Sequence, residues 1–406
     1  MISRHSTILL LFLAQWLLLL SVSCTGDARG QAAVSIVIPP PPKPKPSPWQ
    51  PLADGYARFF EQSMRLSGAP GAAVAIVKDS QIVLLRGFGV RAGGSQDSVD
   101  IHTIFRLGSL SKGFAGVLAG VLVADSVLSW DEPVRKRYPE FKLSDSKQAE
   151  RVQLRHLLSH TTGLPYHAFT NLIEQDYPLE KIAGEYFPKA RLFGREGEFY
   201  AYQNAAFSVA GEMMQRATGI AYPELLRRKI FEPAGMKDAS CDHASMANAP
   251  NHALPNAWTG YNWRAEELSG GYYANAAPAG GVNASAADMG QWLQVLLGCE
   301  PSIITAATLD QVFQPMIKTD KERRIFPNWI ARDGAAYAMG WRVLTLPQGG
   351  ELMYHSGYVN GFRSEIALNR GDGVGICVLF NANSDLARQC IPEFFRQWEQ
   401  FKATRH

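Results

Sequence analysis

The sequence has little net charge, because neither basic nor acidic residues are in large excess. Its 40 lysines and arginines nearly balance 37 aspartates and glutamates, which gives a formal net charge of +3 at pH 7. No block of basic residues stands out, so we do not expect a nucleic acid as a partner. No segment repeats at a solenoid period. With 46% hydrophobic and 19% charged residues among 406, the composition is typical of a globular protein with one large domain or two smaller ones.

The apolar run at the N-terminus is short for a membrane span. It covers residues 8–20, follows Arg4 and His5, and leads to Cys24 through small residues. A basic start, a short apolar core and small residues after it are typical of a secretory signal. We therefore expect residues 1–23 to be a signal peptide and the protein to be exported to the periplasm.

Cysteine is scarce too, with five in the chain. Residues 20–24 resemble a bacterial lipobox with serine in place of leucine, so two fates stay open for Cys24: an ordinary mature N-terminus, or a lipidated one that tethers the protein to a membrane. The other four lack metal-site spacing and are Cys241, Cys299, Cys377 and Cys390. In an exported protein they could pair or stay as buried thiols, and their spacing does not decide between the two.

Proline, in contrast, is concentrated in residues 38–51. Such a segment favours an extended polyproline spacer, and we assign residues 24–51 to a proline-rich linker. A stiff arm after an export signal would hold a domain away from a membrane. The alternative is a disordered mature N-terminus without such a role.

Strand-like and helix-like segments follow in a distinctive order from residue 52 onward. Strand-like runs come first and last, and a mostly helical region separates them. The strand-like runs are 71–77, 81–88, 353–369 and 374–380. We predict one α+β domain over residues 52–402. Its antiparallel sheet would be built from both ends of the domain and flanked by helices, with a mostly helical subdomain beside it.

Ser109 and Lys112 form the first pair suited to chemistry. Residues three apart on a helix share a face, so hydroxyl and amine can point into one space at the start of the apolar run 114–123. A serine hydroxyl needs a base at neutral pH, and a lysine serves when burial lowers its pKa. Free N–H groups at a helix N-terminus also favour developing negative charge. The structural alternative is an N-cap serine followed by a solvated lysine.

A second pair, Tyr202 and Asn204, precedes another helix-like run. Side chains two apart in an extended segment can face one cleft, where a phenol relays a proton and an amide binds a carbonyl. Packing of the tyrosine at a helix start is the alternative.

Two histidines, His156 and His160, lie four residues apart and could share a metal on a helix. No third ligand follows at metal-site spacing. We therefore predict that His160 has a structural or near-site role at a helix end and that the protein holds no metal.

Five landmarks, taken together and in order, resemble those of one enzyme superfamily. Ser109-Leu110-Ser111-Lys112, Tyr202-Gln203-Asn204 and His355-Ser356-Gly357 match the three motifs of the serine β-lactamase and penicillin-binding superfamily in order and approximate separation. Residues 157–165 resemble its Leu-Leu-x-His-Thr-Ser-Gly-Leu-Pro stretch. A loop with Gly280 and Gly281 ahead of Ser285 and Asp288 is similar to another landmark.

The resemblance covers residues 53–400 and is closest to the class C β-lactamase branch, which includes D-alanyl-D-alanine carboxypeptidases and esterases. It implies a β-lactamase/transpeptidase-like fold and acyl-enzyme chemistry. Ser109 would attack the carbonyl, Lys112 and Tyr202 would transfer protons, and Asn204 would hold a substrate amide. The N–H groups of Ser109 and Tyr358 would form the oxyanion hole. The implied substrate-binding set is Asn204, His355, Ser356, Gly357 and Tyr358, and no metal or organic cofactor is implied.

The third motif departs from class C β-lactamases, which carry Lys-Thr-Gly where this chain has His355-Ser356-Gly357. A histidine is charged only below about pH 6.5 unless a partner raises its pKa. Gln203 also replaces a smaller residue, and we expect it to narrow the cleft floor. Both changes weaken the case for efficient β-lactam hydrolysis and leave serine acyl chemistry intact.

Three functions follow from these motifs. The leading one is an exported serine hydrolase acting on β-lactams or D-alanyl-D-alanine-type peptides. The second is an esterase that uses the same Ser109, and the third is a penicillin-binding or sensing protein that turns over slowly. The expected partner is a small-molecule acyl substrate, and we expect a monomer.

Overall fold

The computed structural model describes residues 24–26, 32–34, 47–319, 334–347 and 349–405. The expected signal peptide, residues 1–23, lies outside the described residues, as does much of the expected linker. The chain divides into two units, residues 1–47 and 48–406. In the first unit, β1 (Cys24–Gly26) pairs with β2 (Ala32–Val34) in an antiparallel ladder. Among the described residues no helix has both the length and the apolar character needed to cross a membrane.

The second unit is built on an eight-stranded antiparallel sheet. Its order is β4-β3-β14-β13-β12-β11-β10-β9. The strands are β3 (Gly71–Lys78), β4 (Gln81–Gly89), β9 (Ile317–Lys318), β10 (Gly334–Tyr337), β11 (Arg342–Thr345), β12 (Glu351–Val359), β13 (Phe362–Asn369) and β14 (Val374–Phe380). Since β3 pairs directly with β14, the sheet joins both ends of the domain, and the predicted α+β architecture is confirmed.

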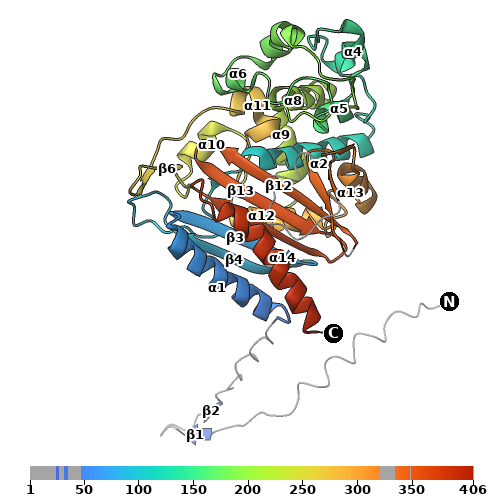
Figure 1. The fold of residues 1–406 in the computed structure, drawn as a ribbon. Coiled ribbons are helices and arrows are strands. Elements are labelled where there is room, and N and C mark those ends of the chain that lie inside the picture. Colours follow the sequence, from blue (N-terminus) through green and yellow to red (C-terminus); the bar gives the residue numbers. More distant parts are fainter. Residues whose placement is uncertain (1–23, 27–31, 35–46, 320–333, 348, 406) are drawn as a thin grey trace, which may run out of the picture. The chain divides into compact units, whose positions relative to one another are not determined.

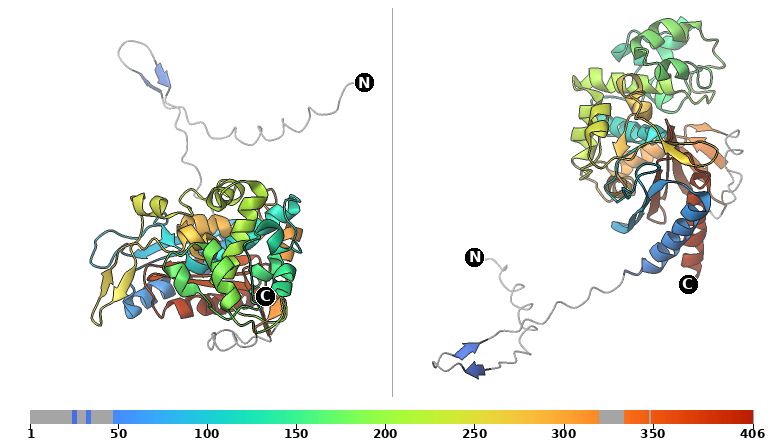
Figure 2. Two further views of the ribbon diagram at one scale, coloured as in Figure 1. Left: turned by 90° about the horizontal axis from the view of Figure 1, so that it is seen from above. Right: turned by 90° about the vertical axis from the view of Figure 1, so that its left-hand side faces the viewer.

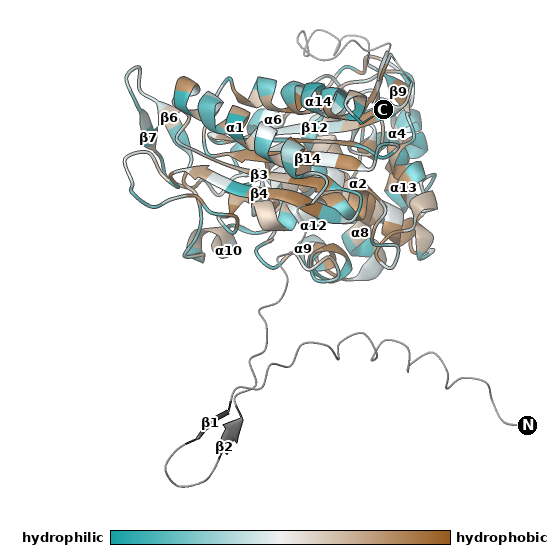
Figure 3. Ribbon diagram, turned by 90° about the horizontal axis from the view of Figure 1, so that it is seen from below, coloured by the Kyte–Doolittle hydropathy of each residue, from teal (hydrophilic) through white to brown (hydrophobic). Residues whose placement is uncertain are grey.

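Burial explains the place of each strand in this sheet. Every residue of β3 and β14 is buried, as expected for central strands covered on both faces, whereas β4 lies at an edge and is largely half-exposed. Figure 3 shows largely apolar strands covered by two helices that alternate hydrophilic and apolar residues.

Those two helices, α1 (Gln50–Ser67) and α14 (Ala387–Ala403), cover one face of the sheet together (Figure 1). Each has an apolar stripe at helical spacing, and the Tyr56 hydroxyl donates a hydrogen bond to the Cys390 carbonyl at 2.9 Å. The first and last helices of the domain are thereby joined.

The other face carries α2 (Ser111–Ala124) and α12 (Ala286–Leu296), and beyond them the helical half of the domain. Twelve of the fourteen residues of α2 are buried, because the helix lies between the sheet and the helical half. The remaining α-helices are α3 (Val134–Arg137), α4 (Ser146–Arg151), α5 (Leu154–Leu158), α6 (Thr170–Glu174), α7 (Leu179–Lys181), α8 (Asn204–Thr218), α9 (Tyr222–Leu226), α10 (His243–Asn248), α11 (Tyr273–Gly280) and α13 (Ala306–Phe313).

Two expectations about loops and cysteines are resolved. The expected glycine loop at Gly280 is the end of α11, and Ser285 then caps α12 in a reciprocal bond with Asp288. The four cysteines of the domain are free thiols, and three of them are buried.

Small two-stranded ladders complete the fold: β5 (Phe105–Arg106) with β8 (Asn283–Ala284), and β6 (Asn256–Trp258) with β7 (Trp263–Ala265).

Candidate active site

Ser109 lies in a single 3₁₀ turn, η1 (Gly108–Leu110), directly before α2. Gly108 has φ +53°, and a Cβ there would lie 2.9 Å from the backbone nitrogen of Tyr358. This position therefore needs glycine both for its left-handed backbone and for the close approach to β12. The result is a half-buried serine at the start of a buried helix, pressed against the third motif.

Lys112, one turn further along, is completely buried. Its Nζ lies 2.8 Å from Asn204 Oδ1, 2.8 Å from the Ala279 carbonyl oxygen and 3.2 Å from Ser109 Oγ. Burial, and secondarily the charge of Arg342, lower the pKa of Lys112 well below its usual value. A neutral amine has two N–H groups and one lone pair. In that form, the two shorter bonds take up the N–H groups and leave the lone pair for the hydroxyl of Ser109, whose proton it can accept; in the protonated form, the amine donates to Ser109 Oγ instead.

Tyr202 and Asn204 meet Lys112 from the start of α8. Asn204 accepts the lysine bond just described, and the Tyr202 ring centroid lies 4.8 Å from Lys112 Nζ. The two side chains thus face the same point, as the sequence predicts. Gln203, between them, does not narrow the cleft floor: it is buried, its Oε1 accepts from Ala205 N at 3.1 Å, and its Nε2 donates to the Pro165 carbonyl. The amide caps α8, because the helix start needs an acceptor.

His160 holds this second motif in place. Its Nδ1 accepts a hydrogen bond from Gln203 N at 3.1 Å, and its ring lies 4.3 Å from the Tyr202 ring. Burial lowers the pKa of His160 well below the usual value, so the ring is neutral and can accept. His156 instead accepts from Gln153 N, away from His160. Within the described ranges no group of three or more metal-ligating side chains occurs.

The third motif lies on β12, where that strand extends past the end of β11. The ladder between β11 and β12 ends at the pair Arg342 and Tyr354. Residues 355–359 therefore have no β11 partner on that edge, and the segment around Ser109 packs there instead. A Cβ at Gly357 would collide with the Leu107 carbonyl and Ser364 Oγ, and would lie 3.1 Å from Ser109 N. The backbone of Gly357 and Tyr358 is therefore adjacent to Ser109 N, the arrangement an oxyanion hole requires.

His355 is buried behind this edge. Its Nδ1 lies 2.8 Å from the Ser356 carbonyl, and its Nε2 lies 3.0 Å from Tyr337 OH and 3.3 Å from Arg342 Nη1. A carbonyl and a guanidinium fix the tautomer: Nδ1–H donates and Nε2 accepts. Burial, then the charges of Arg342 and Lys112, lower the pKa of His355 well below its usual value. The histidine is a neutral acceptor and does not replace the missing lysine charge.

Arg342 is the site residue that the sequence motifs do not include. It is buried on β11, and its guanidinium lies 5.5 Å from the Tyr202 ring and 5.7 Å from the Tyr337 ring. A guanidinium stays charged at any working pH, so Arg342 brings a fixed positive charge to the site. One signal was present in the sequence: this arginine interrupts the apolar run 335–346.

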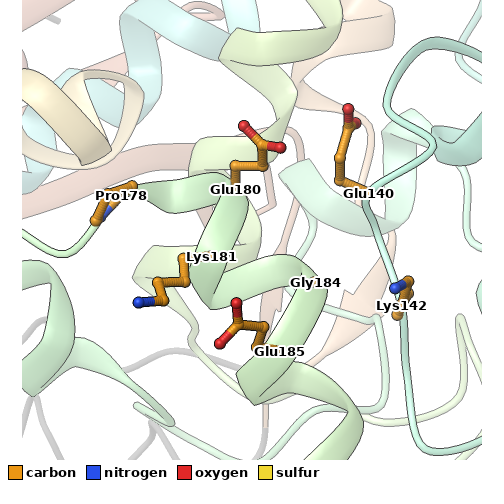
Figure 4. A pocket seen from close by; sticks show the side chains of 7 residues that line it. All are labelled: Glu140, Lys142, Pro178, Glu180, Lys181, Gly184 and Glu185. Carbon is orange, nitrogen blue, oxygen red and sulfur yellow. The ribbon is translucent and has the colours of Figure 1, made fainter.

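A separate hollow lies on the helical half (Figure 4). Glutamates and lysines of two segments line it, and none of the motif residues is among them. The lining residues are Glu140, Lys142, Pro178, Glu180, Lys181, Gly184 and Glu185. The lining residues contain no paired nucleophile and base.

Comparisons with known proteins agree with this geometry. A family model described as Beta-lactamase matches residues 56–392. Unguisins hydrolase ungD' of Aspergillus campestris is 26% identical over 82% of this chain, and Protein flp of Staphylococcus aureus strain N315 is 25% identical over 82%. This chain spans 62% and 64% of the length of those relatives.

Among solved structures, the octameric penicillin-binding protein homologue from Pyrococcus abyssi superposes with a TM-score of 0.71 at 25% identity. The match covers 81% of this chain and 73% of that one.

Proposed function

Because the chain belongs to the beta-lactamase family of serine hydrolases, we propose that it is an exported hydrolase which forms an acyl-enzyme on Ser109. The proposed substrates are β-lactams or D-alanyl-D-alanine-type peptides. One observation carries the proposal: a fully buried amine, whose pKa is lowered by burial, lies 3.2 Å from the serine hydroxyl and makes two shorter contacts to oxygens of Asn204 and Ala279.

The proposed acylation follows from the contacts. Lys112 accepts the proton of Ser109 as the hydroxyl oxygen attacks the substrate carbonyl, and the N–H groups of Ser109 and Tyr358 stabilise the oxyanion. Tyr202, whose ring lies 4.8 Å from Lys112 Nζ, relays a proton to the leaving group. Water then attacks the acyl-enzyme and frees Ser109.

The charge of Arg342 supports a substrate that carries a carboxylate. β-Lactams and D-alanyl peptides both place one close to the scissile amide. Since His355 is neutral, the permanently charged guanidinium of Arg342, beside the Tyr202 ring, is the group that we propose attracts it. A charge-assisted hydrogen bond to a carboxylate contributes about 1.5–3 kcal/mol, which corresponds to about a 10- to 150-fold preference.

A slow-turnover penicillin-binding protein is the second candidate, favoured by the likeness to a penicillin-binding protein homologue. An esterase on small acyl esters is the third, favoured by the absence of the lysine at position 355.

Intact mass spectrometry of the purified domain separates these functions. Samples are taken from seconds to hours after a penicillin or a cephalosporin is added, and Ser109→Ala serves as the control. A transient adduct with accumulating hydrolysed drug supports a β-lactamase, and a long-lived adduct supports a penicillin-binding protein. Turnover of a nitrophenyl ester without any adduct supports an esterase. An adduct that survives in Ser109→Ala would place the nucleophile elsewhere.

A further inference from the structure

We propose that the β6–β7 hairpin is a distal substrate subsite, which binds a large apolar group of the acyl substrate several residues away from the scissile bond. This inference rests on the proposed serine hydrolase function and names a substrate class for it. The tip of the hairpin carries Trp258, Tyr261 and Trp263.

Two of these three rings are exposed, and Trp263 is half-buried. Tyr261 is 94% exposed and Trp258 is 55% exposed, although burying an aromatic ring is strongly favourable. The two other exposed tyrosines are beside the catalytic groups: Tyr358 adjoins Gly357, and the Tyr166 ring lies 6.4 Å from the Tyr202 ring. Exposed aromatic residues therefore occur at the active site, on the hairpin and at Phe193, whose ring lies 6.0 Å from the Phe199 ring.

The hairpin is connected at its base to the end of β12. Gly361, in the turn between β12 and β13, approaches Pro255 so closely that a Cβ would lie 2.9 Å from the proline Cβ. Asn256 is buried there, and its Oδ1 accepts from Gly93 N at 2.7 Å while its backbone N donates to the Asn381 carbonyl. The strand that carries Tyr358 and the strand that carries Trp258 thus meet at one fixed point.

The segment of residues 254–271, which contains the hairpin, ends close to the nucleophile. Arg106, three residues before Ser109, is buried and donates to the Ser269 carbonyl at 2.8 Å and the Gly271 carbonyl at 2.7 Å. Residues 254–271 therefore begin beside the oxyanion strand and end beside the nucleophile turn. The hairpin projects from the domain between these two anchors, as Figures 1 and 2 show.

The geometry of the rings favours an apolar group over a sugar. Trp258 and Trp263 pair across the hairpin at 5.4 Å with an interplanar angle of 61°, which makes an angled corner and not a flat platform. The Thr259 hydroxyl donates within the turn, to Asn262 Oδ1 at 2.8 Å, and Trp263 Nε1 is buried without a hydrogen-bond partner, so neither group is presented to a ligand at the surface. An apolar side chain fits such a corner without needing further hydrogen bonds.

The connection between the end of β12 and the base of the hairpin also limits the length of the substrate. Gly361 is three positions after Tyr358, and Trp258 is three positions after Pro255, which amounts to at most about 10 Å for each step. A group bound at Trp258 would lie up to about 20 Å from the scissile carbonyl, which is about six extended residues.

Hydrolysis of three nitrophenyl esters by the domain tests the proposal. Their acyl groups are acetyl, a hexa-alanine peptide, and the same peptide with phenylalanine at the two positions farthest from the ester. We expect W258A/Y261A to lower kcat/KM about tenfold for the phenylalanine peptide alone, since one aromatic contact is worth about a factor of ten. Leu66→Ala, which removes a side chain 81% exposed at the end of α1, is the matched control and should change none of the three.

Several results would overturn the subsite. One is an equal loss on all three esters, and another is no loss on any. Sedimentation with phosphatidylcholine vesicles that depends on Trp258 and Tyr261, with unchanged ester ratios, would assign the hairpin to a membrane surface. Dimerisation lost in the double variant would assign it to a second copy of the chain.

Direct binding separates this inference from the proposed function. If the parent protein cleaves none of the esters, the phenylalanine peptide amide is titrated against Ser109→Ala with and without W258A/Y261A. A tenfold weaker binding in the triple variant would retain the subsite although the hydrolase proposal fails. Equal binding by Ser109→Ala and the triple variant would rule out the subsite.

Discussion

The Nε2 of His355 accepts a hydrogen bond from the guanidinium of Arg342, with 3.3 Å between the two nitrogens. This contact assigns the two residues different tasks. The arginine carries the charge, while the histidine is neutral and supports it from β12.

The neutrality of His355 predicts that substrate affinity is flat in pH. Burial, Arg342 and Lys112 all lower the pKa of His355, so the ring does not titrate between pH 6 and 8. We expect Ser109→Ala to bind a carboxylated substrate with the same Kd at pH 6, 7 and 8, as measured by fluorescence titration. Affinity that weakens as pH rises, and becomes flat in His355→Gln, would show that the ring binds as a cation.

Replacement of Arg342 should affect carboxylated substrates selectively. In Arg342→Gln the neutral amide can still donate to His355, but the charge is lost, so we expect KM for a penicillin to rise about 10- to 100-fold. Hydrolysis of a neutral nitrophenyl ester should change less than threefold. Arg342→Lys should be intermediate, because an ammonium lacks the planar fork. Equal losses on both substrates would indicate a purely structural role.

Lys112 should control the rate at which Ser109 becomes acylated. We expect Lys112→Met to lower the rate of fluorophosphonate labelling by about 10²–10⁴-fold, the usual contribution of a general base. In the parent, labelling should slow as pH falls through the lowered pKa of Lys112, because a protonated amine accepts no proton. Lys142→Met removes an exposed lysine and should label normally. Labelling of Lys112→Met at the parent rate would require another base.

Gly357 should tolerate no side chain. In Gly357→Ala the Cβ would push β12 away from Leu107 and Ser364, which separates the oxyanion N–H groups. We expect about a hundredfold slower acylation and a loss of about 1–3 kcal/mol in unfolding free energy. Gly270→Ala is the comparison, because a Cβ there meets no atom within 4 Å. Denaturant melts and labelling rates of both variants check this, and a fully active Gly357→Ala would contradict the close packing.

The sequence predicts those parts of the site that depend on local spacing. Ser109 and Lys112 are one helical turn apart, and the pattern of strands at both ends predicts the sheet. Arg342 could not be placed in this way, because only the non-local register of β11 with β12 brings it to His355. Gln203 is predicted to narrow the cleft floor because it replaces a smaller residue in the second motif. That prediction is wrong, because a side chain at this position, directly before α8, caps the start of the helix.

The pairing of β3 with β14 has a consequence for the order of folding. Lys78 pairs with Val374, so the centre of the sheet joins segments that lie far apart in the sequence. Such non-local contacts carry the loop-closure entropy of nearly the whole domain and slow folding. β12 lies two strands beyond this join, so we expect the oxyanion hole to form only once the last strand of the sheet has left the ribosome.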